Sequence, residues 1–243
     1  MRICILFVLM SGLMAVQRHE PKRDLVKDPL KHGKQILQRA QRAMGGTDKL
    51  TAVKDVTHKM EIALEPAAGG FTMKQTSLYI VPNHIRQVQE MPFGRVTIYS
   101  DGESGWLATP QGVQPIPLDI LTKAKGVIFR QPSSLILSGH YPSRSVKAVG
   151  ENAVNILTAD GQSILIQFDS ETGLPERQIY TEPGANGSSA EKTEIFSDWR
   201  NVGGIKMPYK AVQRENGVKI LEVTVLEYRI NTGITAKEIS KRP

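Results

Sequence analysis

The chain has 243 residues, enough for one large β domain or two small ones, and its 40% hydrophobic and 23% charged content is that of a globular protein. The formal net charge is +7, but residues 17–54 carry ten basic and four acidic side chains, so +6 of it lies there. Nucleic-acid binders usually carry basic side chains across a folded surface, so this distribution argues against nucleic acid. The sole cysteine, Cys4, excludes an internal disulfide.

The N-terminus has the pattern of an export signal. Met1-Arg2 precedes the mostly apolar run Ile3–Val16, which is shorter than the ~20 residues of a membrane-spanning helix. The sequence therefore predicts a signal peptide at 1–16, a periplasmic or secreted protein, and membrane association that is at most peripheral. The alternative is that this segment is an uncleaved membrane anchor, or that the start of the gene is wrongly assigned. The charged residues 17–28 are predicted to be a linker.

A helix is predicted from Pro29 to Met44. Asp28 suits the N-cap, proline suits the first helical position, and Gly45-Gly46 can end the helix in a left-handed conformation. One face is apolar, with residues at spacings of three and four: Leu30, Gly33, Ile36, Leu37, Ala40, Ala43 and Met44. A second short helical turn is predicted at Asp48–Val53.

From Val56 the apolar period changes to two, which predicts strands. Val56, His58, Met60, Ile62 and Leu64 share one face of the first strand. Turns, most of them containing glycine, separate most of the later runs: Phe71–Val81, His84–Met91, Arg95–Ser100, Gly105–Thr109, Val146–Val149, Ala153–Ala159, Gln162–Asp169, Pro175–Thr181, Thr193–Trp199, Ile205–Arg214 and Val218–Ile230. A helix at Leu118–Phe129 interrupts this series.

These elements predict a mainly β (α+β) fold. No connection after residue 140 can hold a crossover helix, so the strands should pair antiparallel. We expect a large curled sheet of about ten strands, an incomplete, half-open β-barrel covered by the N-terminal helix and the helical insertion. The domain should span residues 29–232, with a C-terminal tail at 233–243.

No pattern indicates catalysis or a metal site. The five histidines lack zinc-ligand spacing, and no glycine-rich phosphate loop precedes a helix. His58, on the apolar face of its strand, is interpreted as a core histidine with its hydrogen bonds satisfied. The sequence therefore predicts a protein that is not an enzyme and that has no catalytic residue, metal or cofactor.

Four runs together resemble a known family: Ala43–Leu50, Tyr99–Trp106, Phe168–Pro175 and Trp199–Pro208. They resemble bacterial domains of the outer-membrane lipoprotein-sorting and lipoprotein-carrier (LolA-like) superfamily. The resemblance covers about residues 30–232. It implies an unclosed β-barrel whose apolar concavity is plugged by helices and, in the carriers, holds the acyl chains of a lipoprotein without catalysis or metal.

A similar segment also follows peptidase domains of the M16 type, which bind zinc through His-x-x-Glu-His. This chain lacks that run. Two hypotheses follow. In the first, the protein binds a hydrophobic small molecule, lipid or lipoprotein acyl chain. In the second, it is an accessory module that docks a peptidase or another envelope protein.

The first hypothesis predicts an apolar lining from the first two strands and the N-terminal helix: Met60, Ile62, Leu64, Met73, Tyr79, Ile36, Leu37 and Ala40. The same residues would suit a plain core. The gap between the sheet and the Pro29–Met44 helix distinguishes a binding site from a plain core. If side chains fill the gap, these residues form a core, and if it is open, they form a site.

Overall fold

The computed structural model of the protein describes residues 28–159, 161–183 and 189–243. The predicted signal peptide and all of the predicted linker except Asp28 lie outside this part of the chain. Within it, no helix combines the length and apolar character needed to cross a membrane.

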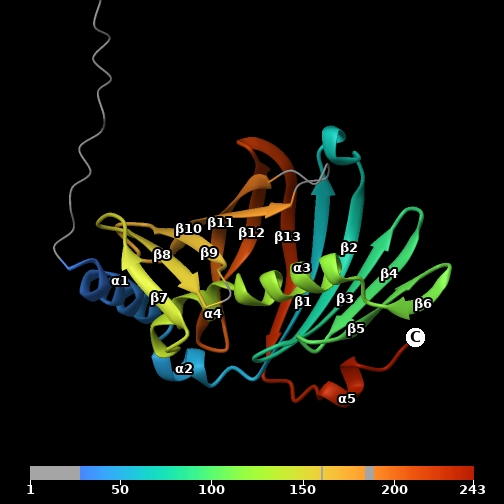
Figure 1. Cartoon of the computed structure of the whole chain (residues 1–243), viewed down its shortest axis with the longest axis horizontal. Coiled ribbons are helices and arrows are strands. Elements are labelled where there is room, and N and C mark those ends of the chain that lie inside the picture. Colours follow the sequence, from blue (N-terminus) through green and yellow to red (C-terminus); the bar gives the residue numbers. More distant parts are fainter. Residues whose placement is uncertain (1–27, 160, 184–188) are drawn as a thin grey trace, which may run out of the picture.

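One antiparallel sheet dominates the described structure (Figure 1). Its strands are β1 (Asp55–Leu64), β2 (Thr72–Ile80), β3 (His84–Met91), β4 (Gly94–Ser100), β5 (Gly105–Thr109), β6 (Gly112–Pro115), β7 (Arg144–Ala148), β8 (Ala153–Thr158), β9 (Ser163–Phe168), β10 (Pro175–Pro183), β11 (Ser189–Val202), β12 (Ile205–Glu215) and β13 (Val218–Ile230). The helices are α1 (Pro29–Ala43), α2 (Thr47–Thr51), α3 (Leu118–Phe129), α4 (Pro132–Ile136) and α5 (Ala236–Ile239), with short 3-10 turns at Pro66–Ala68 and Ser138–His140.

The strand order explains the half-open shape. It runs β6-β5-β4-β3-β2-β1-β13-β12-β11-β10-β9-β8-β7, so strands consecutive in sequence are neighbours, except β6 and β7, and β1 pairs with β13 in the middle. The edges are β6 and β7, and the chain passes between them through α3 and α4 instead of pairing them. Figure 1 shows α3 lying across the face of the sheet.

The predicted antiparallel, half-open architecture is confirmed, with thirteen strands instead of about ten. β6 had no counterpart in the prediction. It has four residues, all exposed, so it carries no alternating apolar pattern that would reveal a strand. The predicted helices at Pro29–Met44 and Leu118–Phe129 are present as α1 and α3.

Helix α1 packs against edge strand β7 and fills the space beneath it. As predicted, the Asp28 carboxylate caps its start, accepting a hydrogen bond from the backbone N–H of Lys31 at 3.1 Å. A Cβ on Gly33 would lie 3.0 Å from the backbone N of Ala148, so glycine permits this close approach. The gap between α1 and the sheet is therefore a core.

The hairpin joining β11 to β12 supports the end of α1. The backbone N–H of Lys206 donates to the carbonyl of Met44 at 2.9 Å. Gly45 has φ +121°, and a Cβ there would lie 2.2 Å from the carbonyl oxygen of Gly204. Two of the four runs that carry the family resemblance thus meet in space, and their glycines allow the contact.

Replacing Gly45 with alanine should destabilise the protein by more than ~1 kcal/mol, because it adds both a steric clash and a strained positive φ. Gly46→Ala is the matched control: Gly46 has φ +99°, but a Cβ there meets nothing within 4 Å. Urea unfolding of both variants checks this. Equal losses of stability would show that the contact with Gly204 contributes nothing.

The other two runs form equivalent turns. Asp101 accepts hydrogen bonds from the backbone N–H groups of Glu103 and Ser104, and Asp169 accepts them from those of Glu171 and Thr172. Backbone and side-chain hydrogen bonds from Thr172 hold the pKa of the Asp169 carboxyl below its usual value. These acidic residues therefore shape turns in the sheet.

The C-terminal tail packs against the sheet. The buried Asp55 carboxylate accepts from the N–H and hydroxyl of Thr232, both at 2.8 Å, and from the N–H of Gly233 at 2.9 Å. Beyond this anchor, Ile239 enters a cluster of buried side chains with Tyr99, Trp106 and Ala108. The tail therefore contributes to the packing of β4 and β5.

Candidate functional site: a groove beneath helix α3

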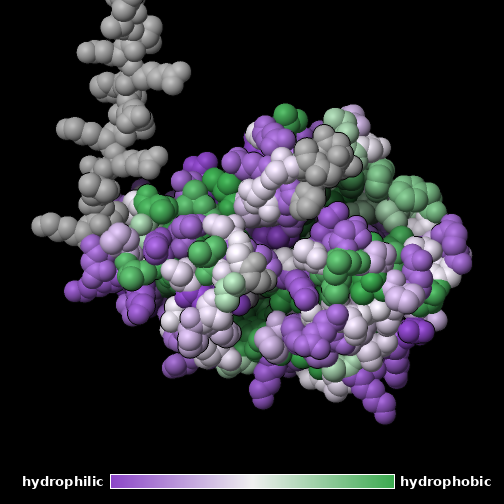
Figure 2. All heavy atoms as spheres, in the orientation of Figure 1, coloured by the Kyte–Doolittle hydropathy of each residue, from purple (hydrophilic) through white to green (hydrophobic). Residues whose placement is uncertain are grey.

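A groove of about 400 Å³ lies between the inner face of the sheet and the end of α3. Its floor is apolar and comes mainly from the central strands, with Met60 and Ile62 on β1, Met73 on β2, and Val223 and Val225 on β13. Figure 2 shows polar and apolar side chains mixed on the face seen there, with apolar atoms also visible in a hollow between them.

The floor follows from strand alternation and register. Ile62 stands opposite Met73 on one side and Val223 on the other, while Met60 stands opposite Val225. Side chains at alternate positions point to the same face, so these ladders form a continuous apolar strip. The volume lies within the ~300–1,000 Å³ range of small-molecule pockets.

Glutamines border the floor on the β2–β3 side. Gln89 donates through Nε2 to Oε1 of Gln75 at 2.9 Å, and Gln75 donates through Nε2 to the hydroxyl of Ser77 at 2.9 Å. Gln75 and Ser77 are buried, so this chain satisfies polar groups that water does not reach.

A carboxylate borders the floor on the opposite side. Glu194 on β11 accepts hydrogen bonds from Nε2 of Gln178 at 2.6 Å, the hydroxyl of Tyr180 at 2.7 Å and Nε2 of Gln213 at 3.0 Å. Burial, with the nearby Glu194 charge, raises the pKa of Tyr180. The phenol therefore stays a donor and keeps the carboxylate fixed at the groove wall.

Arg130, at the end of α3, ties this helix to the sheet. Its guanidinium lies 4.0 Å from the centroid of the Tyr180 ring and forms an ion pair with Glu182. Both charged side chains are largely shielded from solvent, at 11% and 20% exposed, so the pair is screened less than a surface pair. Arg130 thus holds the cover of the groove in place.

His58 lies in the groove wall on β1, between two tyrosines. Its ring centroid is 5.2 Å from that of Tyr79 and 5.3 Å from that of Tyr228. Burial lowers the pKa of His58 to about 3, so the ring is neutral near pH 7. Its two ring nitrogens are buried and have no hydrogen-bond partner among the described residues. The predicted burial is present, but the predicted satisfied hydrogen bonds are not.

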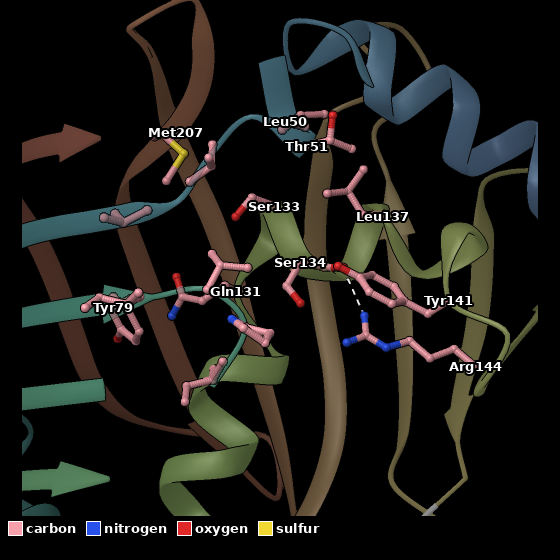
Figure 3. A pocket seen from close by; sticks show the side chains of 16 residues that line it. Leu50, Thr51, Tyr79, Gln131, Ser133, Ser134, Leu137, Tyr141, Arg144 and Met207 are labelled. Carbon is pink, nitrogen blue, oxygen red and sulfur yellow. Dashed lines mark hydrogen bonds between the residues drawn. The ribbon is translucent and has the colours of Figure 1, made fainter. Parts of the chain in front are cut away.

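A second, smaller pocket of about 160 Å³ adjoins the groove (Figure 3). Tyr79 and Gln131 line both cavities, so they stand between them. Figure 3 shows these two residues on one side of the pocket and Tyr141 and Arg144 on the other. The remaining lining is largely apolar: Leu50, Val53, Val56, Ile80, Val81, Pro82, Ile128, Leu137 and Met207, with Thr51, Ser133 and Ser134.

The structure divides the residues predicted to line a site into three groups. Met60, Ile62, Met73 and Tyr79 line the groove. Leu64 is partly buried beside Met60 and Ile62. The three residues of α1 lie in the core, each at most 3% exposed and away from the groove: Ile36, Leu37 and Ala40.

The polar wall was not predicted, although β2 carried a signal for it. Met73, Gln75, Ser77 and Tyr79 alternate along the strand, so the register that points Met73 and Tyr79 inward also points Gln75 inward. Across residues 28–159, 161–183 and 189–243, no three His, Cys, Asp or Glu side chains come together to hold a metal ion.

No protein-family model matches the sequence, and no curated protein matches it either. Solved structures that are similar in fold include the following three. A DUF1329 family protein from Desulfovibrio piger superposes with a TM-score of 0.56 and 13% identity, covering 88% of this chain and 98% of its own. A LolA superfamily protein from Nitrosomonas europaea gives 0.56 and 13%, covering 86% and 97%.

The third structure is a putative outer membrane lipoprotein-sorting protein domain from Vibrio parahaemolyticus, with a TM-score of 0.51, 14% identity and coverage of 86% and 97%. The chain therefore has the fold of LolA-like half-barrels, as its sequence resemblance implied. None of these three proteins is named as a peptidase, so the association with M16 enzymes stays a prediction.

Proposed function

We propose that the protein is a non-catalytic periplasmic binding protein that shelters a lipid or lipoprotein acyl chain in the groove beneath α3. The observation that carries this proposal is the space of about 400 Å³ left unfilled over an apolar floor. A concave, mostly apolar surface with a few polar groups at its border is typical of sites that bind small molecules.

The energetics are adequate for such a ligand. Each buried methylene contributes about 0.8 kcal/mol, so a chain of about 14 carbons supplies roughly 11 kcal/mol before the cost of association. The two methionines in the floor suit chains of different shape, because their side chains are flexible and polarizable. The similar fold of the lipoprotein-sorting domain supports the same class of ligand.

Filling the groove should weaken binding. Ala211 on β12 lines it, so Ala211→Trp should weaken uptake of the uncharged fluorophore N-phenyl-1-naphthylamine at least tenfold. Leu157→Trp is the control, because Leu157 is 44% exposed on β8 and is not among the groove-lining residues.

Native mass spectrometry of protein purified from the periplasm of the cells that produce it should also detect a bound lipid in the wild type and less bound lipid in Ala211→Trp. Absence of any bound lipid, together with no fluorophore uptake by the wild type, would contradict the proposal. Circular dichroism of each variant separates loss of binding from loss of folding.

A further inference from the structure

Unlike the glutamines and Glu194 that border the groove, His58 makes no side-chain hydrogen bond to the described residues. His58 is only 5% exposed, yet both of its ring nitrogens lack a hydrogen-bond partner among the described residues. Buried polar groups are nearly always hydrogen-bonded, and leaving one unpaired is costly. An unpaired imidazole in the wall of a binding groove therefore points to a partner that arrives with the ligand.

The neighbouring polar groups are engaged elsewhere. The Ser77 hydroxyl, on the residue opposite His58 in β2, accepts from Gln75, and Gln75 in turn accepts from Gln89. Tyr79 and Tyr228 present their rings to the imidazole. The titratable groups facing His58 are these two phenols, and burial raises the pKa of both, that of Tyr79 to about 12.

Tyr79 also controls what can reach His58. Its ring packs edge-on against the imidazole and lines both the groove and the smaller pocket. We expect a rotation of this side chain, which would release its hydroxyl from Ser77 and Gln87, to uncover His58. The pocket of about 160 Å³ is close to the ~150 Å³ of engineered apolar cavities that bind benzene, so it has room for a displaced ring or for part of a ligand.

We propose that His58 is the hydrogen-bond donor to the carbonyl of an uncharged acyl ester or amide, which reaches it by displacing the Tyr79 ring. This inference rests on the proposed function and specifies its ligand. The acyl chain lies along Met60, Ile62 and Val223, and the group beyond the carbonyl extends toward the smaller pocket.

The chemistry of the site favours an uncharged carbonyl. A neutral imidazole offers one N–H donor and one bare nitrogen acceptor, which suits a carbonyl or a neighbouring hydroxyl. Two cations, Arg130 and Lys210, line the groove together with Glu194, but the groups packed against His58 are two uncharged phenols. A carboxylate placed at His58 would therefore lose its hydration without gaining an ion pair, which disfavours free fatty acids there.

Competition against N-phenyl-1-naphthylamine tests this ligand class. Two probes carry the same acyl chain on different carbonyls: 1-monopalmitoylglycerol, which has an ester, and an N-palmitoylated peptide, which has an amide. His58→Phe keeps a ring but removes the nitrogens, so at least one probe should compete about tenfold less well than with the wild type. His58→Asn, which keeps an N–H donor, should recover part of the loss.

The outcomes separate this inference from the proposed function. Unchanged competition in His58→Phe, with fluorophore binding intact, overturns the role of His58 and leaves the binding function standing. Failure of the wild type to bind the fluorophore and both probes overturns the function itself. Loss with only one probe supports the inference and identifies whether a glycerolipid or a lipoprotein is the source.

A measurement on the wild type covers the case in which His58→Phe does not fold. Addition of 1-monopalmitoylglycerol or of the N-palmitoylated peptide should shift the ¹⁵N resonances of the His58 ring with at least one of them, because a new hydrogen bond changes their shielding. Ring resonances that stay in place while both probes bind would overturn the assignment.

Discussion

Replacing Trp106 with alanine should lower the free energy of unfolding by about 3–5 kcal/mol, the usual cost of deleting a buried tryptophan side chain. Trp106 is 4% exposed and packs with Tyr99, Ala108 and Ile239. Its indole N–H also donates to the carbonyl of Ser240 at 3.0 Å. The substitution therefore opens a cavity and releases the C-terminal tail together.

Chemical denaturation measures the loss, and limited trypsin digestion after Lys237 and Lys241 reports release of the tail. Trp199→Ala is the control, because the chain's only other tryptophan is half-buried and should cost less. Equal costs for the two substitutions, with a protease-resistant tail in both, would show that the tail does not depend on Trp106.

Lowering the pH from 6.5 to 5 should cost the wild type about 2 kcal/mol more stability than it costs His58→Phe. The pKa of His58 is about 3 in the folded protein and 6.5 in the unfolded chain. Between these values the unfolded state binds a proton that the folded state does not. The part of the free energy of unfolding that depends on a neutral His58 is fully present above about pH 6.5 and is lost as the pH falls toward 3.

Urea unfolding at several pH values tests this, with the difference between the two proteins removing the contribution of the carboxylates common to both. Parallel stability curves for wild type and His58→Phe would mean that His58 is accessible to protons in the folded state. A bound acyl ligand should stabilise the wild type at both pH values, because it binds only the folded protein.

The predictions of helices and strands were correct where a local sequence pattern determined the structure. The caps at Asp28 and Gly45-Gly46 delimit α1, and alternation identified β1 and β2. β6 was missed because an exposed four-residue strand is held by its neighbour and not by its own pattern. Pairing of β1 with β13 depends on residues distant in sequence, which no local period encodes.

The site was predicted only in part for a related reason. Periodicity says which residues of a helix or strand share a face, but it does not say what that face meets. The apolar face of α1 meets β7 and becomes core, while that of β1 lies partly beneath α3 and becomes the groove floor. Gln75 and Glu194 are polar residue types that usually face solvent, and only the register of their strands shows that they point inward.

The junction of β1 and β13 has a consequence for how the chain acquires its structure. Lys54 and Asn231, whose hydrogen bond adjoins this junction, are 177 residues apart. Closing so long a loop costs chain entropy before the pairing can form, so we expect β1 and β13 to pair late. Until the last strand arrives, one side of β1 is an unpaired edge that can join another chain. We therefore expect the newly made protein to need protection from aggregation until its final strand is in place.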